Sequence, residues 1–360
     1  MVLRALFCVL WLSCCGAGYA ESAESDLTER EFVVKDFRLD SGQVLPLARI
    51  RYVTTGRRDQ RAENVVLVPS WYTGTIEDNL YLVDAEAGID PAKYFVVFTE
   101  LFGSGKSSSP SNTPKPFDGP RFPVTTIRDN VRICHQLLFG KLKVRRLCSV
   151  VGFSMGAQQA FQWAVSYPDQ VESIVPVCGT AKTYHHGVVR LESAISCLQA
   201  DANWNNGDLL GPLEKGAEAW ARHWAAWVYS QEWWRKELFR RNGHASPQDV
   251  IKFFVSRFDS SKANDVVLQA RTWQRHDVGG SPGFDGDVEA ALRSIRARVL
   301  YMPGETDLYF PMTDARYEMQ HLKHVVWKPM PSLWGHAAGA GWGDKDKQFI
   351  LKSVRMFLSQ

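Results

Sequence analysis

Five short runs of mainly apolar residues constrain the fold of this chain most strongly. They occupy residues 65–68, 94–98, 147–151, 174–177 and 299–302. Such runs are typical of strands with both faces buried, as in a parallel sheet. Between them, residues 126–138 and 156–166 have helical periodicity, and Pro168 and Asp169 end the second helix. The alternation from about residue 30 to 190 predicts an α/β fold with a mostly parallel central sheet and helices on both faces.

The stretch from residue 191 to 285 differs from this pattern. It lacks apolar strand runs and has the features of helices rich in tryptophan and charge. Three tryptophans fall at positions i, i+4 and i+7 of one helix face: Trp220, Trp224 and Trp227. We interpret residues 191–285 as a helical cap inserted into one α/β core, which comprises residues 30–190 and 286–360. A single core with such an insertion accounts for a chain of 360 residues.

The first twenty residues form a separate segment. Arg4 precedes an apolar run at residues 5–15, and residues 18–20 include the small residues found at cleavage sites. A run of about 11 residues is too short to cross a bilayer, and no other stretch approaches that length. We interpret residues 1–20 as a signal peptide, which predicts a secreted protein or one of the secretory pathway. The alternative is an uncleaved N-terminal segment of an intracellular protein.

Charge and cysteine content exclude several classes of function. A net charge of +3 gives no reason to expect nucleic acid or an anionic membrane as a partner. Outside the N-terminal segment, the cysteines show no metal-ligand spacing, so we expect no metal: Cys134, Cys148, Cys178 and Cys197. Cys148 and Cys178 lie in apolar runs and are interpreted as buried free thiols. In a secreted protein, two of the four could still form a disulfide.

The segment Gly152-Phe153-Ser154-Met155-Gly156 carries the strongest chemical signal. It follows the strand at residues 147–151 and precedes a helix. This is the context of a nucleophile elbow, a tight turn whose flanking glycines avoid clashes. The turn raises a serine to the carboxyl edge of the sheet, at the positive end of the following helix. We therefore predict Ser154 as the nucleophile of an α/β-hydrolase fold.

A serine hydroxyl needs a general base, and the base needs an orienting carboxylate. In this fold both follow the serine in the chain, first the acid and then the histidine, each after a strand. Asp307 lies in the turn after residues 299–302, and His336 follows the apolar stretch at 325–330. We predict a triad of Ser154, Asp307 and His336. Four other residues are weaker acid candidates or surface histidines: Glu305, Asp314, His321 and His324.

Acyl transfer also needs two backbone N–H donors for the oxyanion. We predict Met155 as one donor because it directly follows the nucleophile. The other should come from the loop at residues 69–74, after the strand at 65–68. Tyr72 is our choice, with Trp71 as the alternative. The aromatic side chains of this loop could instead simply wall the pocket.

Residues 103–107, with the sequence Gly-Ser-Gly-Lys-Ser, resemble the end of a phosphate-binding loop. The full pattern requires glycine five residues before Gly105, where this chain has Glu100. The residues after Ser107 do not begin a helix, so no helix N-terminus would face a phosphate. We therefore exclude nucleotide binding and expect no cofactor.

Beyond these motifs, the sequence resembles the homoserine O-acetyltransferase family of α/β hydrolases, from about Val83 to the C-terminus. Four segments carry the resemblance: residues 122–129, the elbow with Gln159-Ala160 and Trp163-Ala164, residues 307–311, and Gly335-His336. Members of the family are often dimers, so the resemblance also allows a homodimer.

Two positions qualify what the resemblance implies. In those acetyltransferases, an aspartate associated with the substrate amine directly follows the catalytic histidine, whereas this chain has Ala337. Charged hydrogen bonds are the strong ones, so losing this partner disfavours homoserine as the acceptor. The family also uses an arginine of the cap for the substrate carboxylate. Arg222 is the nearest match, and a surface ion pair is its alternative role.

These features predict acyl transfer through a covalent acyl-enzyme on Ser154, with a small-molecule ester or acyl donor as the substrate. We favour an ester hydrolase because the homoserine-specific residue is absent and a secreted enzyme would rarely meet acetyl-CoA. An O-acyltransferase to a small alcohol is the first alternative. The second is a catalytically inactive binding protein with the same fold.

Overall fold

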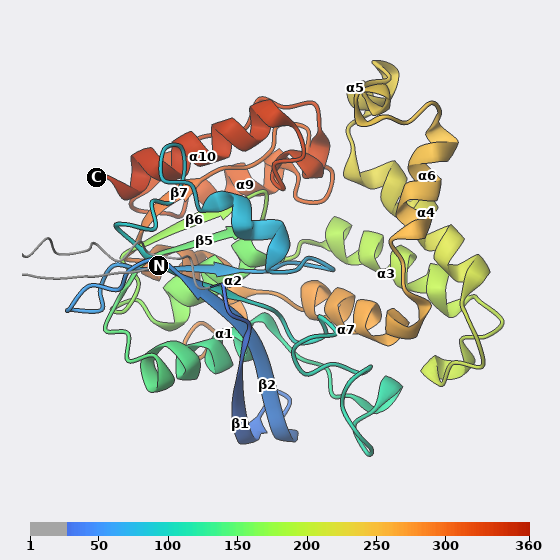
Figure 1. Ribbon diagram of the computed structural model, residues 1–360, viewed down its shortest axis with the longest axis horizontal. Coiled ribbons are helices and arrows are strands. Elements are labelled where there is room, and N and C mark those ends of the chain that lie inside the picture. The colour runs from blue at the N-terminus through green and yellow to red at the C-terminus, as the bar shows by residue number, and fades with distance from the viewer. Residues whose placement is uncertain (1–26) are drawn as a thin grey trace, which may run out of the picture.

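The computed structural model describes residues 27–360, so the predicted signal peptide at residues 1–20 lies outside the described residues. The centre of the molecule is one eight-stranded sheet with strand order β1-β2-β4-β3-β5-β6-β7-β8 (Figure 1). In chain order the strands are β1 (Arg30–Arg38), β2 (Val44–Thr55), β3 (Val65–Pro69), β4 (Phe95–Thr99), β5 (Leu147–Phe153), β6 (Ser173–Val177), β7 (Arg298–Tyr301) and β8 (Val325–Trp327). In sheet order, β4, β3, β5, β6, β7 and β8 each pair in parallel with the next strand. The pairs β1 with β2 and β2 with β4 are antiparallel. The predicted mostly parallel sheet is confirmed.

The central strands are apolar along their length because both faces of the sheet are buried. In β3, Val65 and Leu67 belong to one apolar cluster, and Val66 and Val68 belong to a second cluster on the opposite face. Side chains alternate between the two faces of a strand, so each face needs its own apolar residues.

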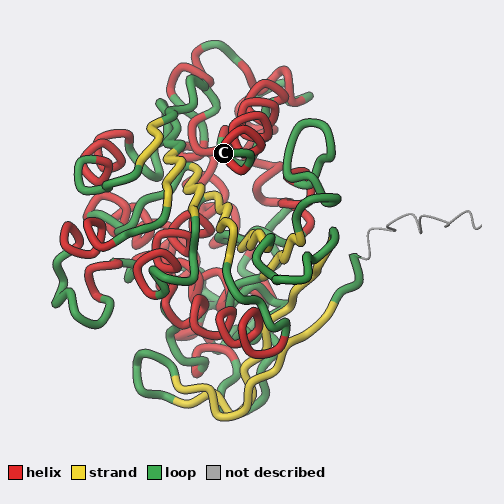
Figure 2. Tube along the Cα trace, turned by 90° about the vertical axis from the view of Figure 1, so that its left-hand side faces the viewer, coloured by secondary structure: helices red, strands yellow, loops and turns green. Residues whose placement is uncertain are grey.

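Helices cover both faces of the sheet, as predicted. α1 (Ile127–His135), α2 (Met155–Ser166) and α8 (Val288–Ser294) pack in the first apolar cluster, whereas α10 (Asp344–Leu358) packs in the second. Figure 1 shows α10 on one side of the strands and α1 and α2 on the other. In Figure 2, turned by 90°, the strands form a band with helices on both sides.

Between β6 and β7 the chain forms a group of helices without strands, which we call the cap. It comprises α3 (His185–Gln199), α4 (Glu214–Val228), α5 (Gln231–Arg235), α6 (Pro247–Ser256) and α7 (Ala263–Gln274). α3 packs on α4 and α7, and α4 packs on α6. The predicted boundary at residue 191 falls inside α3, because the change in composition on which we placed it follows the first turns of that helix.

The hairpin of β1 and β2 was not among the predicted strands. Charged residues such as Arg49 and Arg51 interrupt its apolar positions, so it lacks the continuous apolar run of a central strand. Of the four cysteines in the described region, Cys178 is buried and Cys148 half-buried, and all four are free thiols. Within residues 27–360, no helix is long and apolar enough to cross a membrane.

Candidate active site

Ser154 occupies a sharp turn between the end of β5 and the start of α2. Its backbone angles are φ 57° and ψ −121°, a conformation that non-glycine residues rarely adopt. A Cβ atom on Gly152 would lie 2.1 Å from the Gly156 carbonyl oxygen, and one on Gly156 would lie 2.8 Å from the Pro69 carbonyl oxygen. Both positions therefore require glycine, and the turn presents the serine at the carboxyl edge of the sheet.

The structure brings Ser154, Asp307 and His336 into one hydrogen-bonded line. His336 Nε2 lies 2.9 Å from Ser154 Oγ, and His336 Nδ1 lies 2.8 Å from Asp307 Oδ2. All three residues are buried. The Asp307 carboxylate can only accept a hydrogen bond, so the neutral imidazole carries its proton on Nδ1. This leaves Nε2 unprotonated and able to accept the serine proton. The arrangement can therefore activate the serine as a nucleophile.

The loop after β7 holds the acid in place. Asp307 Oδ1 accepts hydrogen bonds from the backbone N–H groups of Tyr309, at 2.7 Å, and Phe310, at 3.2 Å. These bonds leave Oδ2 to face the histidine. Thr306 Oγ1 donates to the Ser332 carbonyl oxygen at 2.7 Å, which ties this loop to the segment that carries His336.

The imidazole ring of His336 is enclosed by aromatic rings. The Tyr309 ring stacks on it at a centroid distance of 4.3 Å and an interplanar angle of 29°, and the Phe153 ring lies 4.7 Å away. An imidazole in contact with two aromatic rings has few orientations available. The packing therefore supports the position that the hydrogen bond to Asp307 sets.

The oxyanion loop, residues 70–74, follows β3 and contains the predicted donor Tyr72. Gln159 Nε2 donates to the Ser70 carbonyl oxygen at 3.0 Å, and Thr73 N donates to Gln269 Oε1 at 2.7 Å. Within residues 27–360, the N–H groups of Met155 and Tyr72 have no hydrogen-bond acceptor. The same holds for Trp71 N in this region, so both donors predicted for the loop are available to an oxyanion.

A cavity of about 550 Å³ opens onto Ser154 and His336. Aromatic side chains from the core and the cap form much of its wall: Trp71, Tyr72, Phe153, Trp220, Trp224, Phe253, Phe254, Phe258, Trp273, Tyr309 and Trp342. Ala337 also lines the cavity, next to the histidine. Polar side chains contribute as well: Thr73, Thr75, Asp78, Ser104, Arg257, Asp259, Lys262, Asp265 and Gln269. The site can thus hold a small organic molecule against the serine.

Comparison with known proteins identifies the family. Residues 65–338 match the family model of the alpha/beta hydrolase fold, which spans most of the chain. This chain belongs to the α/β-hydrolase family. An ethyl acetate hydrolase of Pseudomonas veronii is 32% identical over 303 residues, which cover 83% of this hydrolase and 86% of the relative.

Two further relatives locate this α/β hydrolase within the family. A homoserine O-acetyltransferase of Solidesulfovibrio magneticus is 29% identical over 340 residues, covering 83% of this chain and 84% of its own. The solved structure of an acetyl esterase matches with a TM-score of 0.88 at 29% identity, covering 92% of this chain and 97% of that chain. The predicted relation to homoserine O-acetyltransferases is confirmed, and esterases stand beside them. This α/β hydrolase is accordingly an enzyme, an ester hydrolase or an acyltransferase.

Arg222, the predicted substrate-binding arginine, is not at the site. Its side chain is exposed on α4, where Nη2 lies 2.7 Å from Glu218 Oε1, and it does not line the cavity. Trp220 and Trp224 on the same helix do line the cavity. Helical spacing places a residue between these two tryptophans on another face, so Arg222 makes the surface ion pair that was its alternative role.

The acid and base alternatives lie apart from Ser154. Glu305 and His324 are exposed, and Asp314 lies on α9 (Met312–Met319). His321 is half-buried, and its Nδ1 lies 3.1 Å from Arg293 Nη2. The acid and the histidine that lie beside the serine, Asp307 and His336, are therefore the two predicted from their places after strand ends.

In the loop at residues 103–107, backbone N–H groups donate to the hydroxyl groups of nearby serines. Gly105 N donates to Ser109 Oγ at 2.8 Å, and Lys106 N and Ser107 N donate to Ser104 Oγ at 3.2 and 3.0 Å. A phosphate-binding loop instead directs such N–H groups at the ligand. In this loop, the three N–H groups are therefore directed at serine hydroxyl groups of the chain.

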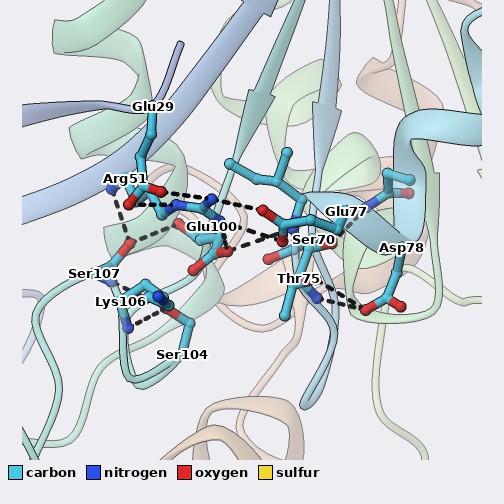
Figure 3. Close-up of polar contacts among 12 residues, drawn as sticks. Glu29, Arg51, Ser70, Thr75, Glu77, Asp78, Glu100, Ser104, Lys106 and Ser107 are labelled. Atoms are coloured by element: carbon cyan, nitrogen blue, oxygen red, sulfur yellow. Dashed lines mark hydrogen bonds and ion pairs between the residues drawn. The ribbon is translucent and has the colours of Figure 1, made fainter. Parts of the chain in front are cut away.

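Glu100, at the position where that pattern requires glycine, is buried and belongs to a partly exposed ion-pair cluster (Figure 3). The guanidinium of Arg51 on β2 lies among three carboxylates: those of Glu29, Glu77 and Glu100. Burial raises the pKa of Glu100, and the charge of Arg51 opposes that effect. Ser107 Oγ also accepts from Arg51 N at 3.1 Å. The cluster anchors the loops after β3 and β4, which form part of the cavity wall.

Two side chains of the site were missed by the sequence analysis. Gln269 on α7 lies 196 residues from the Thr73 N–H that it binds, and it belongs to no motif. Tyr309 was noticed only as part of the family's acid segment. The apolar pattern around it gives no sign that its ring stacks on His336, so only the folded structure reveals that contact.

Proposed function

We propose that this α/β hydrolase is a carboxylic ester hydrolase acting on small neutral esters through a covalent acyl-enzyme on Ser154. The observation that carries the proposal is the line Ser154–His336–Asp307, which opens into a cavity walled by aromatic side chains. A serine with a positioned base, an oriented acid and free N–H donors beside it has the parts that acyl transfer requires.

The geometry suggests the following steps. Ser154 Oγ attacks the ester carbonyl carbon while His336 Nε2 takes its proton, and Asp307 stabilises the imidazolium that forms. The N–H groups of Met155 and of Tyr72 or Trp71 stabilise the oxyanion. His336 then gives the proton to the leaving alcohol. Water, deprotonated by the same nitrogen, releases the acid and restores the serine.

The identity of residue 337 supports hydrolysis of neutral esters over transfer to homoserine. Ala337 is buried and presents a methyl group to the cavity at the position where the acetyltransferases have an aspartate. An ammonium group would lose its charged partner there, and burying it unpaired is costly. The relatives named ethyl acetate hydrolase and acetyl esterase support an acetyl ester as the first substrate to test.

The experiment that tests this function measures turnover of p-nitrophenyl acetate and ethyl acetate by the purified protein, with and without added homoserine. We expect acetate as the product, with little O-acetylhomoserine. The Ser154→Ala variant, purified in parallel, is the matched control for background hydrolysis. Transfer of most acetyl groups to homoserine would contradict the proposal and establish the acyltransferase alternative.

Two predictions about the whole protein remain proposals. The basic residue, apolar run and small residues within residues 1–20 support a signal peptide and secretion, which N-terminal analysis of the mature protein would test. The relation to homoserine O-acetyltransferases supports a homodimer, which light scattering of the purified protein would test.

A further inference from the structure

Arg190 on α3 is a buried cation. Its side chain is almost wholly inaccessible, with 3% of the residue exposed. Among residues 27–360, none of its three guanidinium nitrogens has a hydrogen-bond partner. Burial lowers the pKa of Arg190 to about 10, so the group still carries its charge at neutral pH. A buried charge is costly unless other groups stabilise it.

Aromatic rings surround this guanidinium. Its central carbon lies 4.2 Å from the ring centroid of Tyr309, 4.7 Å from that of Trp273 and 5.3 Å from that of Trp224. Each distance is within the range of a cation–π interaction. The three rings come from the loop after β7, from α7 and from α4, so the cation joins two cap helices to the loop that carries Asp307.

Tyr309 connects this cation to the triad. Its ring lies against the guanidinium and also stacks on the His336 imidazole, at a centroid distance of 4.3 Å. Its backbone N–H donates to Asp307 Oδ1 at 2.7 Å. One residue therefore touches the acid and the base of the triad and also Arg190.

We propose that Arg190 is a positioning residue of the triad, which holds the Tyr309 ring against His336 and thereby fixes the geometry of Asp307 and His336. The proposal rests on the proposed ester hydrolysis for its main readout. Arg190 does not line the cavity, whereas all three rings around it do. It therefore acts through those rings and not by contact with the ester.

Because Arg190 does not contact the ester, we expect its replacement to lower kcat and to change KM little. A displacement of about 1 Å at the reacting groups can cost about 100-fold in rate. We expect Arg190→Met to lower kcat for a neutral ester by roughly 10-fold to 100-fold, because the Tyr309 ring loses the cation that holds it. Arg190→Lys keeps a cation among the rings and should recover part of the loss.

A double-mutant cycle with Tyr309→Leu tests the route of the effect. The leucine removes the ring but keeps the backbone N–H that binds Asp307. If Arg190 acts through this ring, the double variant Arg190→Met/Tyr309→Leu should be no slower than Tyr309→Leu alone. Multiplicative losses would overturn the proposal, because they would show that the two residues act independently.

The matched control is Arg271→Met on α7. This arginine also joins α7 to α3, through an ion pair with Glu192, but it contacts no triad residue and does not line the cavity. We expect its kcat to stay at the wild-type value while thermal unfolding reports any loss of cap stability. An equal fall in kcat in Arg271→Met and Arg190→Met would overturn the proposal, since general loosening of the cap would then explain both.

Further measurements test the role of Arg190 where ester turnover is too slow to detect or where a variant does not fold. The rate at which a fluorophosphonate labels Ser154 reports the triad without any ester, so a fall in Arg190→Met supports the proposal even where ester turnover is undetectable. If Arg190→Met does not fold, Arg190→Lys and Tyr309→Leu carry the same comparison. A raised KM confined to carboxylate-bearing esters, with kcat for neutral esters unchanged, would overturn positioning and indicate an anion subsite.

Discussion

The two walls of the cavity are built in different ways. On the core side, backbone geometry and hydrogen bonds hold the reacting groups: Ser154 in a strained turn, and Asp307 by two N–H groups. On the cap side, within residues 27–360, buried polar atoms without a hydrogen-bond partner include Trp224 Nε1 and the guanidinium of Arg190. Aromatic packing holds that side together. The core thus holds the reacting groups, whereas the cap supplies a packed aromatic wall of the cavity.

The largest effect that this comparison predicts is the loss of a core group. Ser154→Ala and His336→Ala should each lower kcat for p-nitrophenyl acetate by roughly 1,000-fold or more, because the serine and its base act as a unit. The double variant should be little slower than either single variant. Steady-state kinetics beside thermal unfolding checks this, and multiplicative losses would mean that the two residues work separately.

A smaller effect should follow where the cap supports the core. Gln269→Leu removes the acceptor of the Thr73 N–H, in an oxyanion loop where Thr73 has a φ of 57°. Displacing this loop misplaces the Tyr72 and Trp71 donors, so we expect kcat to fall by roughly 10-fold to 100-fold. The matched variant Gln269→Glu keeps an acceptor and should stay closer to wild type. Equal losses in both variants would show that volume or charge at this position matters, and not the hydrogen bond.

Within the core, Glu318 on α9 should make stability depend on pH. The residue is fully buried, and burial raises its pKa to about 8, while hydrogen bonds from Ala181 N and Tyr301 Oη oppose the shift. The folded protein then keeps a proton that the unfolded chain, with an ordinary pKa of 4.5, releases. The free energy of unfolding therefore falls as pH rises from 4.5 to about 8, by up to about 1.4 kcal/mol per pH unit.

The Glu318→Gln variant has no titrating proton at this position and should lack that part of the slope. Urea unfolding of both proteins at pH 5 and pH 8 measures the difference. The wild type should lose stability relative to the variant at the higher pH. Parallel pH dependences would show that the carboxyl group is ionised in the folded protein across this range.

The smallest effect is expected on the outer face of the cap. Arg222 makes an exposed ion pair with Glu218, and exposed pairs contribute little to stability. Arg222→Ala should therefore leave kcat and KM for a neutral ester within about twofold of wild type. A marked rise in KM would return Arg222 to the site and contradict its placement on the surface.

The contrast between core and cap also decides what the sequence could predict. The parallel strands were predictable because two buried faces demand continuous apolar runs, as at residues 65–68. The triad was predictable because chain order and strand ends restrict where the acid and the histidine can lie. Both arguments use local patterns that the fold imposes on its sequence.

The cap gave no comparable pattern. Arg222 and Arg190 are both arginines on cap helices, but one is exposed beside Glu218 and the other is buried among three rings. Which of the two approaches the triad depends on how α3, α4 and α7 pack, and that packing joins residues far apart in the chain. The contacts of Gln269 and Tyr309 were missed for the same reason.

We expect Ser154 to form an acyl-enzyme during ester hydrolysis. Rapid acid quenching of the enzyme during turnover of p-nitrophenyl acetate, followed by peptide mass mapping, tests it most directly. We expect an added acetyl group on the peptide that contains Ser154, which disappears when the substrate is exhausted and is absent from Ser154→Ala. Turnover without any acetylated Ser154, or acetylation of another residue that decays at the rate of turnover, would contradict it.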